Sequence, residues 1–235
     1  MDFRNRTVVV TGGIGALGSA VIGALLAAGA HCRIPYLIAR EAEAFPHRGS
    51  DHVTLVADCD LTDEADVGRL YEGAAGLWAS IQIAGGFASG SLAETDKAAL
   101  MAMIETNLLT CHLCCRAAVR AMSAGSGSGG RIVNVAARPA LEPRTGAGAA
   151  AYTASKAAVA ALTQALAEEV AGQDILVNAV APSVIDTPAN RSAMPAADHA
   201  RWATPEAIAA TIAFLASPEN KVTRGGVIPV YGRAG

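Results

Sequence analysis

The sequence predicts an α/β fold in which one doubly wound parallel sheet of about seven strands carries helices on both faces. Short runs of β-branched and aliphatic residues alternate along the chain with longer stretches that are rich in helix formers. The 235 residues are 52% hydrophobic and 17% charged, with 24 glycines, which is typical of a buried sheet rather than a disordered chain. The sequence contains no internal repeat and no sign of a second domain, so residues 1–235 are expected to form a single domain.

The first half of the chain supplies four of the expected strands, at residues 6–11, 30–38, 52–57 and 77–84. Pro35 weakens the second of these runs, because proline cannot donate a hydrogen bond to a neighbouring strand. Helices are expected at residues 19–28 and 63–74, the latter with Thr62 as its cap. A long helix is expected at residues 96–122, and the glycine- and serine-rich stretch 125–130 ends it.

The second half supplies three further strands, at residues 131–136, 174–181 and 226–231. Pro182 ends the sixth strand, and Pro229 places the seventh at an edge of the sheet. Alanine-rich residues 151–169 form a helix, and Thr204 followed by Pro205 starts another with a cap and a first-turn proline. Residues 183–203 are too long and polar for a simple connection, so we expect a substrate loop there.

A glycine turn joins the first strand to the first helix, with glycines at Gly12, Gly15 and Gly18. Glycines allow a tight turn and the close approach of a pyrophosphate, and the following helix offers free N–H groups and the positive end of its dipole. A strand before the turn and a helix after it predict a dinucleotide-binding Rossmann fold.

Tyr152 and Lys156 are four residues apart in the helical stretch 151–169, so both side chains lie on one helix face. The pKa of a free tyrosine is about 10, and a nearby ammonium group would lower that pKa and create a useful proton donor. Taken alone, such a pair is more often an ordinary surface tyrosine and lysine on an amphipathic helix.

Charge and cysteine content restrict the partners and the compartment. A net charge of −3 gives no electrostatic footprint for nucleic acid. The sequence contains no uninterrupted apolar run of about 18 residues, so no membrane span is expected. The N-terminal residues do not resemble a secretory signal. The five cysteines form no disulfide framework, which favours reduced thiols in a cytoplasmic protein. A metal site built from Cys111, His112, Cys114 and Cys115 is a remote alternative, so no metal is expected.

Together these motifs resemble the short-chain dehydrogenase/reductases over the whole chain. The resemblance rests on Thr11-Gly12 with its glycine turn, Asp60 after the third strand, Ala84-Gly85 after the fourth, Asn107 in the long helix, Tyr152 with Lys156, and Pro182 with Thr187 after the sixth strand.

The resemblance implies a nicotinamide-dependent enzyme in which Tyr152 is the general acid/base. Lys156 would hold the nicotinamide ribose and lower the pKa of Tyr152, and Asn107 would anchor a water relay to that lysine. Thr187 would touch the carboxamide and Asp60 the adenine. The implied cofactor-binding residues are Gly12, Gly15, Ala16, Leu17, Gly18, Asp60, Leu61, Ala84, Gly85, Gly86, Tyr152, Lys156, Pro182, Ile185 and Thr187.

Two further positions concern the cofactor. The glycine spacing is a variant of the usual one. Tyr36 stands where NAD-dependent members carry an acid for the ribose hydroxyls, so both NADH and NADPH stay open. Arg33 and Arg40 lie nearby in the sequence, and Arg40 could pair with a 2′-phosphate, although both could also be solvated surface charges. Glu41 or Glu43 is the alternative acid.

The family usually has a serine at the end of the fifth strand, and Ala137 occupies that place by strand position. By spacing alone the place would be Pro139, which also lacks a hydroxyl, and Thr145 is well into the loop. The serine would hydrogen-bond a substrate carbonyl, which alanine cannot do.

Dihydropteridine reductases are members of the family that lack this serine, and the chain resembles them locally. The similar segments are the glycine turn, residues 84–87, and the loop 186–198 followed by Trp202 and Thr204-Pro205.

This resemblance implies a quinonoid dihydropteridine as substrate, bound near Phe87, Ala137 and Asn190, with Phe87 lying against a flat ring or simply packing. The alternatives are an atypical carbonyl/hydroxyl oxidoreductase and a nucleotide-binding protein that catalyses nothing. A homodimer or homotetramer, paired through the helices of Asn107 and Tyr152, is implied as well.

Overall fold

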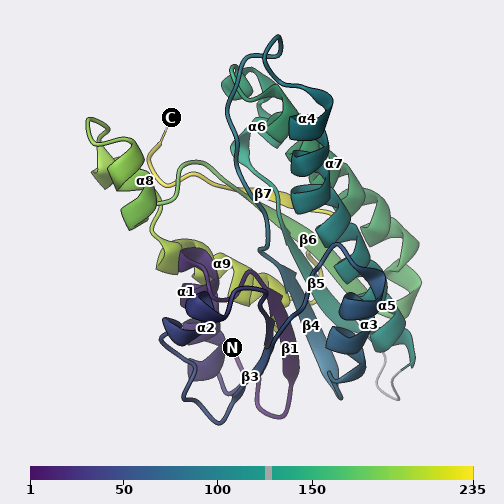
Figure 1. Ribbon diagram of the computed structural model, residues 1–235. Coiled ribbons are helices and arrows are strands. Elements are labelled where there is room, and N and C mark those ends of the chain that lie inside the picture. The colour runs from purple at the N-terminus through teal and green to yellow at the C-terminus, as the bar shows by residue number, and fades with distance from the viewer. Residues whose placement is uncertain (125–128, 235) are drawn as a thin grey trace.

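Seven parallel strands form one sheet in the computed structural model, which describes residues 1–124 and 129–234 (Figure 1). The strands are β1 (Thr7–Thr11), β2 (His31–Pro35), β3 (Val53–Val56), β4 (Leu77–Gln82), β5 (Gly130–Val135), β6 (Ile175–Pro182) and β7 (Val227–Val230). Their order across the sheet is β3-β2-β1-β4-β5-β6-β7. The chain therefore winds outward in both directions from β1 and β4, which confirms the predicted doubly wound fold.

Helices cover both faces of this sheet. One face carries α1 (Ala16–Ala27) and α9 (Pro205–Ala216), which pack against each other, and the other carries α3 (Glu64–Glu72), α5 (Thr110–Ala124) and α7 (Ala150–Glu169) (Figure 1). The expected long helix consists of α4 (Lys97–Met103), a π-helical stretch Ile104–Leu109, and α5. The short helices α2 (Ala39–Glu43), α6 (Arg138–Leu141) and α8 (Pro188–Ala193) fall in segments that the sequence pattern left irregular.

Alternation along the strands builds two hydrophobic clusters, one on each face of the sheet. In β1, Val8 and Val10 point to the cluster beneath α1 and α9, whereas Val9 points to the cluster beneath α3, α5 and α7. All three side chains are fully buried. Burial on both faces explains why the strand sequences read as continuous apolar runs rather than as alternating ones.

Several expected boundaries change in detail. β2 ends at Pro35 instead of residue 38, although Tyr36 still donates its backbone N–H to the Val56 carbonyl of β3. Thr62 is not the cap of α3: Asp63 occupies that position, and its carboxylate accepts hydrogen bonds from the backbone N–H groups of Ala65 and Asp66. The edge position expected from Pro229 is confirmed, since β7 ends the sheet. Part of the glycine- and serine-rich stretch, residues 125–128, lies outside the described residues.

The 28-residue segment Lys97–Ala124 is, within the described part of the chain, the one helix long and apolar enough to cross a membrane by length and composition. It contacts β4, α3 and α7, so it is also a layer of the helical cover on the sheet. Its position brings the middle of the helix to the carboxyl end of β4.

Candidate active site

The segments that follow β1, β3, β4, β5 and β6 meet at the carboxyl edge of the sheet. In a doubly wound fold this edge is where ligands bind. The glycine turn, the Ala84–Gly86 segment and the loop after β6 all begin there, as the sequence predicted. The first turns of α7 and the π-helical stretch bring the remaining predicted catalytic side chains to the same edge.

The glycine turn after β1 leaves no room for a side chain at Gly12 or at Gly18. Gly12 has a φ of 63°, and a Cβ there would lie 2.7 Å from the backbone nitrogen of Ala84. A Cβ on Gly18 would lie 2.2 Å from the Gly12 carbonyl oxygen. Gly15 precedes α1 without any side-chain cap among the described residues, so Ala16, Leu17 and Gly18 open the helix with N–H groups that face its N-terminal end.

This turn therefore fits a pyrophosphate. The positive end of a 12-residue helix dipole and the first-turn N–H groups supply its charge complement. Thr11 fixes the neighbouring strand end, because its Oγ1 accepts a hydrogen bond of 3.3 Å from Ala84 N–H.

At the far end of this edge, Asp60 and Leu61 follow β3 and are half-buried. The Asp60 carboxylate accepts hydrogen bonds of 2.8 and 2.7 Å from the backbone and hydroxyl of Thr62, which fixes the turn. Tyr36, directly after β2, continues the ladder by donating its backbone N–H to the Val56 carbonyl at 2.9 Å.

The two arginines near Tyr36 behave differently. The Arg33 guanidinium donates from Nε to the Leu70 carbonyl of α3 at 2.8 Å and packs against Gly73, so it is a structural group rather than a candidate phosphate ligand. Arg40 is exposed on α2, as are Glu41 and Glu43. Strand alternation explains the difference, because Arg33 lies within β2 and points to the α3 face, whereas Arg40 lies beyond the strand.

Lys156 is buried, and its Nζ donates a hydrogen bond of 2.8 Å to the Val135 carbonyl at the end of β5. Burial lowers the pKa of Lys156 to about 8, since the charged form loses water. The segment after β4 passes close to Lys156. A Cβ on Gly85 would lie 3.1 Å from Lys156 Nζ and 2.6 Å from Asn107 Oδ1. Glycine at this position lets the backbone pass over both side chains.

Asn107 is buried in the π-helical stretch and forms two hydrogen bonds with the segment after β4. Its Oδ1 accepts from Gly86 N–H at 2.9 Å, and its Nδ2 donates to the Gly86 carbonyl at 3.1 Å. A second Nδ2 bond of 3.0 Å reaches Ser155 Oγ on α7. A π-helical turn widens the helix locally and is frequent at functional sites. Here the turn contains the asparagine that joins α7 to the loop.

Tyr152 lies in the first turn of α7 beside Phe87. The two rings meet edge to face with centroids 4.9 Å apart, and Phe87 is 67% exposed. Burial raises the pKa of Tyr152 to about 12. The expectation that Lys156 lowers this pKa is therefore wrong for this structure. The cause is that loss of water dominates at the phenol, while the Lys156 ammonium is directed to the Val135 carbonyl.

Ala137 ends the segment after β5, is buried, and precedes α6. Neither of the two alternative positions supplies a free hydroxyl: Pro139 has none, and Thr145 Oγ1 donates to the Glu142 carbonyl at 2.8 Å. Arg138, the next residue, bonds the Glu142 carboxylate at 2.8 Å.

The loop after β6 is held by its own side chains. Thr187 caps α8 by accepting from Asn190 N–H at 3.2 Å, and Asn190 Nδ2 donates to the Ile185 carbonyl at 2.8 Å. Ile185 also pairs with Ala203 as an isolated bridge that closes the base of the loop. Pro182 is the last residue of β6, as expected. Asn190, predicted to touch the substrate, therefore uses its backbone N–H and one side-chain N–H for hydrogen bonds within the loop itself.

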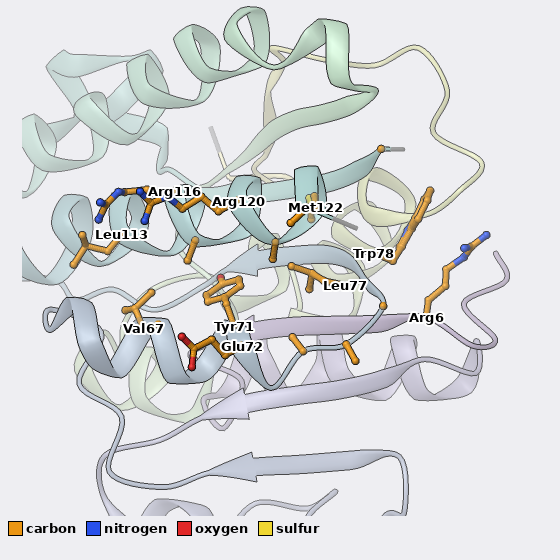
Figure 2. Close-up of a pocket in the computed structure, with 18 of the residues that line it drawn as sticks. Arg6, Val67, Tyr71, Glu72, Leu77, Trp78, Leu113, Arg116, Arg120 and Met122 are labelled. Atoms are coloured by element: carbon orange, nitrogen blue, oxygen red, sulfur yellow. The ribbon is translucent and has the colours of Figure 1, made fainter. Parts of the chain in front are cut away.

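A surface groove lies away from this site. It is a groove of about 850 Å³ between α3 and α5, with Tyr71, Glu72, Arg116, Arg120 and Met122 around it (Figure 2). None of the predicted catalytic or cofactor-binding residues lines it.

All five cysteines are free and buried. Burial raises the pKa of Cys32 to about 12 and that of Cys59 to about 11, so these thiols stay protonated. In the described ranges, no group of three or more His, Cys, Asp and Glu side chains could hold a metal ion.

Sequence reasoning missed Ser155, which precedes Lys156 and touches Asn107. The available signal was a serine directly before Lys156 in an alanine-rich helical stretch.

Comparisons with known proteins agree with this arrangement. A sequence model of the short chain dehydrogenase family matches residues 6–198. The chain is 37% identical over 245 residues to a cis-4-hydroxycyclohexanecarboxylate dehydrogenase from Sinomonas cyclohexanicum, covering 98% of this chain and 96% of the relative. It is 31% identical over 244 residues to carbonyl reductase family member 4 from Danio rerio, with 97% of each chain covered.

Solved structures show the same fold. ElxO with NADP bound superimposes with a TM-score of 0.86 at 27% identity and 97% coverage of both chains. A short-chain type dehydrogenase/reductase from Mycobacterium ulcerans gives a TM-score of 0.89 at 25% identity, covering 99% of this chain and 90% of that one.

Proposed function

The chain belongs to the short-chain dehydrogenase family, and from that premise we propose that it is an NAD(P)H-dependent reductase of a small organic acceptor, with Tyr152 as its proton donor. The observation that carries this proposal is that Lys156 and Asn107 meet at Gly85, next to a glycine turn that fits a pyrophosphate, while Tyr152 lies one turn before Lys156 on α7 and beside Phe87. The nicotinamide, when bound, supplies the hydride.

Each side chain has a distinct part in this proposal. Tyr152 holds a proton on its phenol oxygen near neutral pH, because burial keeps the phenol neutral. Lys156 is fixed by the Val135 carbonyl and presents a positive charge toward the site. Asn107 fixes the Ala84–Gly86 segment, along which the cofactor would lie. The first turn of α1, Asp60 with Leu61, and Pro182, Ile185 and Thr187 would hold the remaining parts of the cofactor.

We expect the protein to accept both cofactors, because Tyr36 offers no carboxylate to bind the ribose hydroxyls or to repel a 2′-phosphate. Exposed Arg40 is a partner for that phosphate, and the relative ElxO was solved with NADP. Tyr36→Asp should shift the ratio of kcat/KM values toward NADH by about tenfold or more. Arg40→Ala should weaken NADPH alone. An Arg40→Ala variant with unchanged NADPH affinity would assign that phosphate to another group.

For the substrate, we put a quinonoid dihydropteridine first. Two observations support it: no hydroxyl stands at Ala137 to hold an isolated carbonyl, and the exposed Phe87 ring lies beside Tyr152 as a surface for a flat heterocycle. A conjugated ring spreads the incoming charge, so the missing hydrogen-bond donor matters less.

The second candidate is an alcohol or ketone on a small carbon skeleton. It is favoured by the printed names of the relatives, which include a hydroxycyclohexanecarboxylate dehydrogenase and a carbonyl reductase. Losing one donor to a developing oxyanion typically costs about 2.7–4 kcal/mol, so an enzyme for simple ketones would need a replacement that the segment after β5 does not offer.

The test is NAD(P)H oxidation with chemically generated quinonoid dihydropterin beside a panel of ketones and cyclic alcohols. We expect turnover of the pterin and poor turnover of simple ketones. Ala137→Ser should leave the pterin reaction unimproved and raise a trace ketone activity. Efficient ketone reduction without any pterin reaction would rule out the quinonoid dihydropteridine and favour the alcohol or ketone as substrate.

Two further proposals follow from the surface and the thiols. The face formed by α4, α5 and α7 is the proposed pairing surface of a homodimer or homotetramer, since Leu100 and Met101 are each 40% exposed there. Five free, buried thiols suit a reducing compartment, which supports a cytoplasmic location.

A further inference from the structure

Ser155 links three parts of the candidate site although it cannot reach a substrate. It is fully buried on α7, between Tyr152 and Lys156 in the sequence. Its Oγ donates to the Tyr152 carbonyl at 2.8 Å and accepts from Asn107 Nδ2 at 3.0 Å. Because Asn107 also bonds both backbone groups of Gly86, one chain of hydrogen bonds runs from the loop after β4 to the first turn of α7.

Near its start, α7 is tied to the rest of the site by Ser155 and by the Lys156 Nζ bond to the Val135 carbonyl, but its first turn has no cap among the described side chains. Its N-cap residue is Ala149, and no side chain in the described structure caps the helix. Helix ends fray unless their groups are satisfied. Tyr152 lies in this first turn, so the hydrogen bonds of Ser155, about one turn further along α7, limit its movement.

We propose that Ser155 is a positioning residue, which holds Tyr152 and Asn107 in register with the Gly85–Gly86 segment. This inference rests on the proposed function, because positioning matters for turnover only if Tyr152 delivers a proton. Asn107 packs tightly against this segment: the Cβ of any side chain placed at Gly85 would lie 2.6 Å from Asn107 Oδ1. Displacement of reacting groups by about 1 Å can cost up to about 10²-fold in rate.

The same helix supplies a matched control. Thr163 is also fully buried, its Oγ1 donates to the Val159 carbonyl at 2.8 Å, and it accepts from the side-chain amide of Asn134 at 2.9 Å. Thr163 thus makes the same pair of bonds about two turns beyond Ser155. Thr163→Val removes a comparable buried hydroxyl without touching Tyr152, Asn107 or Gly86.

The first experiment measures amide hydrogen exchange in the full chain and needs no substrate. Ser155→Ala should speed exchange of the Gly86 N–H by about tenfold, because Asn107 loses its tie to α7. Thr163→Val should leave that amide unchanged. Equal exchange at Gly86 in wild type and Ser155→Ala would overturn the proposal, as would the same acceleration in Thr163→Val.

The second experiment is a double-mutant cycle on kcat with whichever acceptor the wild type reduces. Ser155→Ala should lower kcat by about tenfold with little change in the KM for the cofactor. If Ser155 acts through Asn107, the Ser155→Ala, Asn107→Ala double variant should lose no more activity than Asn107→Ala alone. Fully additive losses would contradict the proposal.

The two experiments separate the two levels of inference. A wild type that reduces none of the acceptors refutes the proposed function, while the exchange measurement still decides whether Ser155 holds the loop. Normal kcat in Ser155→Ala, combined with faster exchange at Gly86, would show a structural tie without catalytic consequence and would overturn the positioning role.

Discussion

Burial drives Tyr152 and Lys156 in the same direction, toward their neutral forms. It raises the pKa of the phenol to about 12 and lowers the pKa of the ammonium to about 8. At neutral pH the phenol therefore keeps its proton, while most of the lysine stays charged. A protonated phenol suits the delivery of a proton to a reduced product, which is consistent with a reductase.

Tyr152→Phe tests this role directly. The change removes only the hydroxyl, and no hydrogen bond of that hydroxyl is seen in the described structure, so the fold and the cofactor affinity should stay nearly intact. Turnover should fall by about 10²-fold or more, the usual scale for general acid–base catalysis. Steady-state kinetics and fluorescence titration with NADPH measure the two effects. Near-normal turnover would mean that solvent or the substrate's own tautomerism provides the proton.

Lys156 should also leave a signature in the pH dependence of stability. Because its pKa is lower in the folded state (about 8) than its usual value of 10.5, the unfolded chain binds more protons between these two values. The contribution of Lys156 to the free energy of unfolding is therefore fully present above about pH 10.5 and is lost as pH falls through about 8.

Urea unfolding of wild type and Lys156→Met at several pH values between 8 and 10 measures this effect. The wild type should gain stability relative to the variant as pH rises, with a total on the order of 3 kcal/mol at most. A pH-independent difference would show that Lys156 is better solvated than its burial suggests.

At the scale of elements, the pattern of the sequence predicted all seven strands and the main helices, because buried parallel strands are apolar throughout and the glycine and proline positions separate them. The short helices α2, α6 and α8 were not predicted, since segments of four to six residues carry too little periodicity. The π-helical turn around Asn107 was not predicted either, because the contacts of that side chain with Gly86 and Ser155 are tertiary and leave no local pattern in the sequence.

The start of α3 shows the same limit. Thr62 and Asp63 are both good capping residues, and the local sequence does not separate them. The structure does: the Thr62 hydroxyl is used by Asp60, which leaves the Asp63 carboxylate for the helix.

Asp63→Ala should accordingly lower the free energy of unfolding by about 1 kcal/mol, the typical value of a lost cap. Chemical denaturation measures this value, and Thr62→Val is the matched comparison because it leaves the N–H groups of α3 capped. A larger loss in Thr62→Val than in Asp63→Ala would return the cap to Thr62.

At the scale of the whole molecule, the site and the proposed pairing surface share the same helices. The α4–α5 segment carries Asn107 toward the sheet and Leu100 and Met101 away from it, while α7 carries Tyr152 and Lys156. Only a third of the apolar window in Lys97–Ala124 is buried within the chain. Large exposed apolar surfaces on a folded domain mark contacts with partners. A second copy of this chain is the partner we propose.

Replacing both Leu100 and Met101 by Asp should therefore separate the subunits. Two charges would have to be buried without partners in the interface, which is strongly unfavourable. Light scattering after size-exclusion chromatography should show a smaller mass for the Leu100→Asp, Met101→Asp variant than for the wild type. Val222→Asp, at a residue that is 87% exposed in the loop before β7, is the control and should keep the wild-type mass. An unchanged mass in the double variant would move the interface to another face. A loss of turnover together with the loss of mass would show that pairing also steadies the helix that carries Asn107.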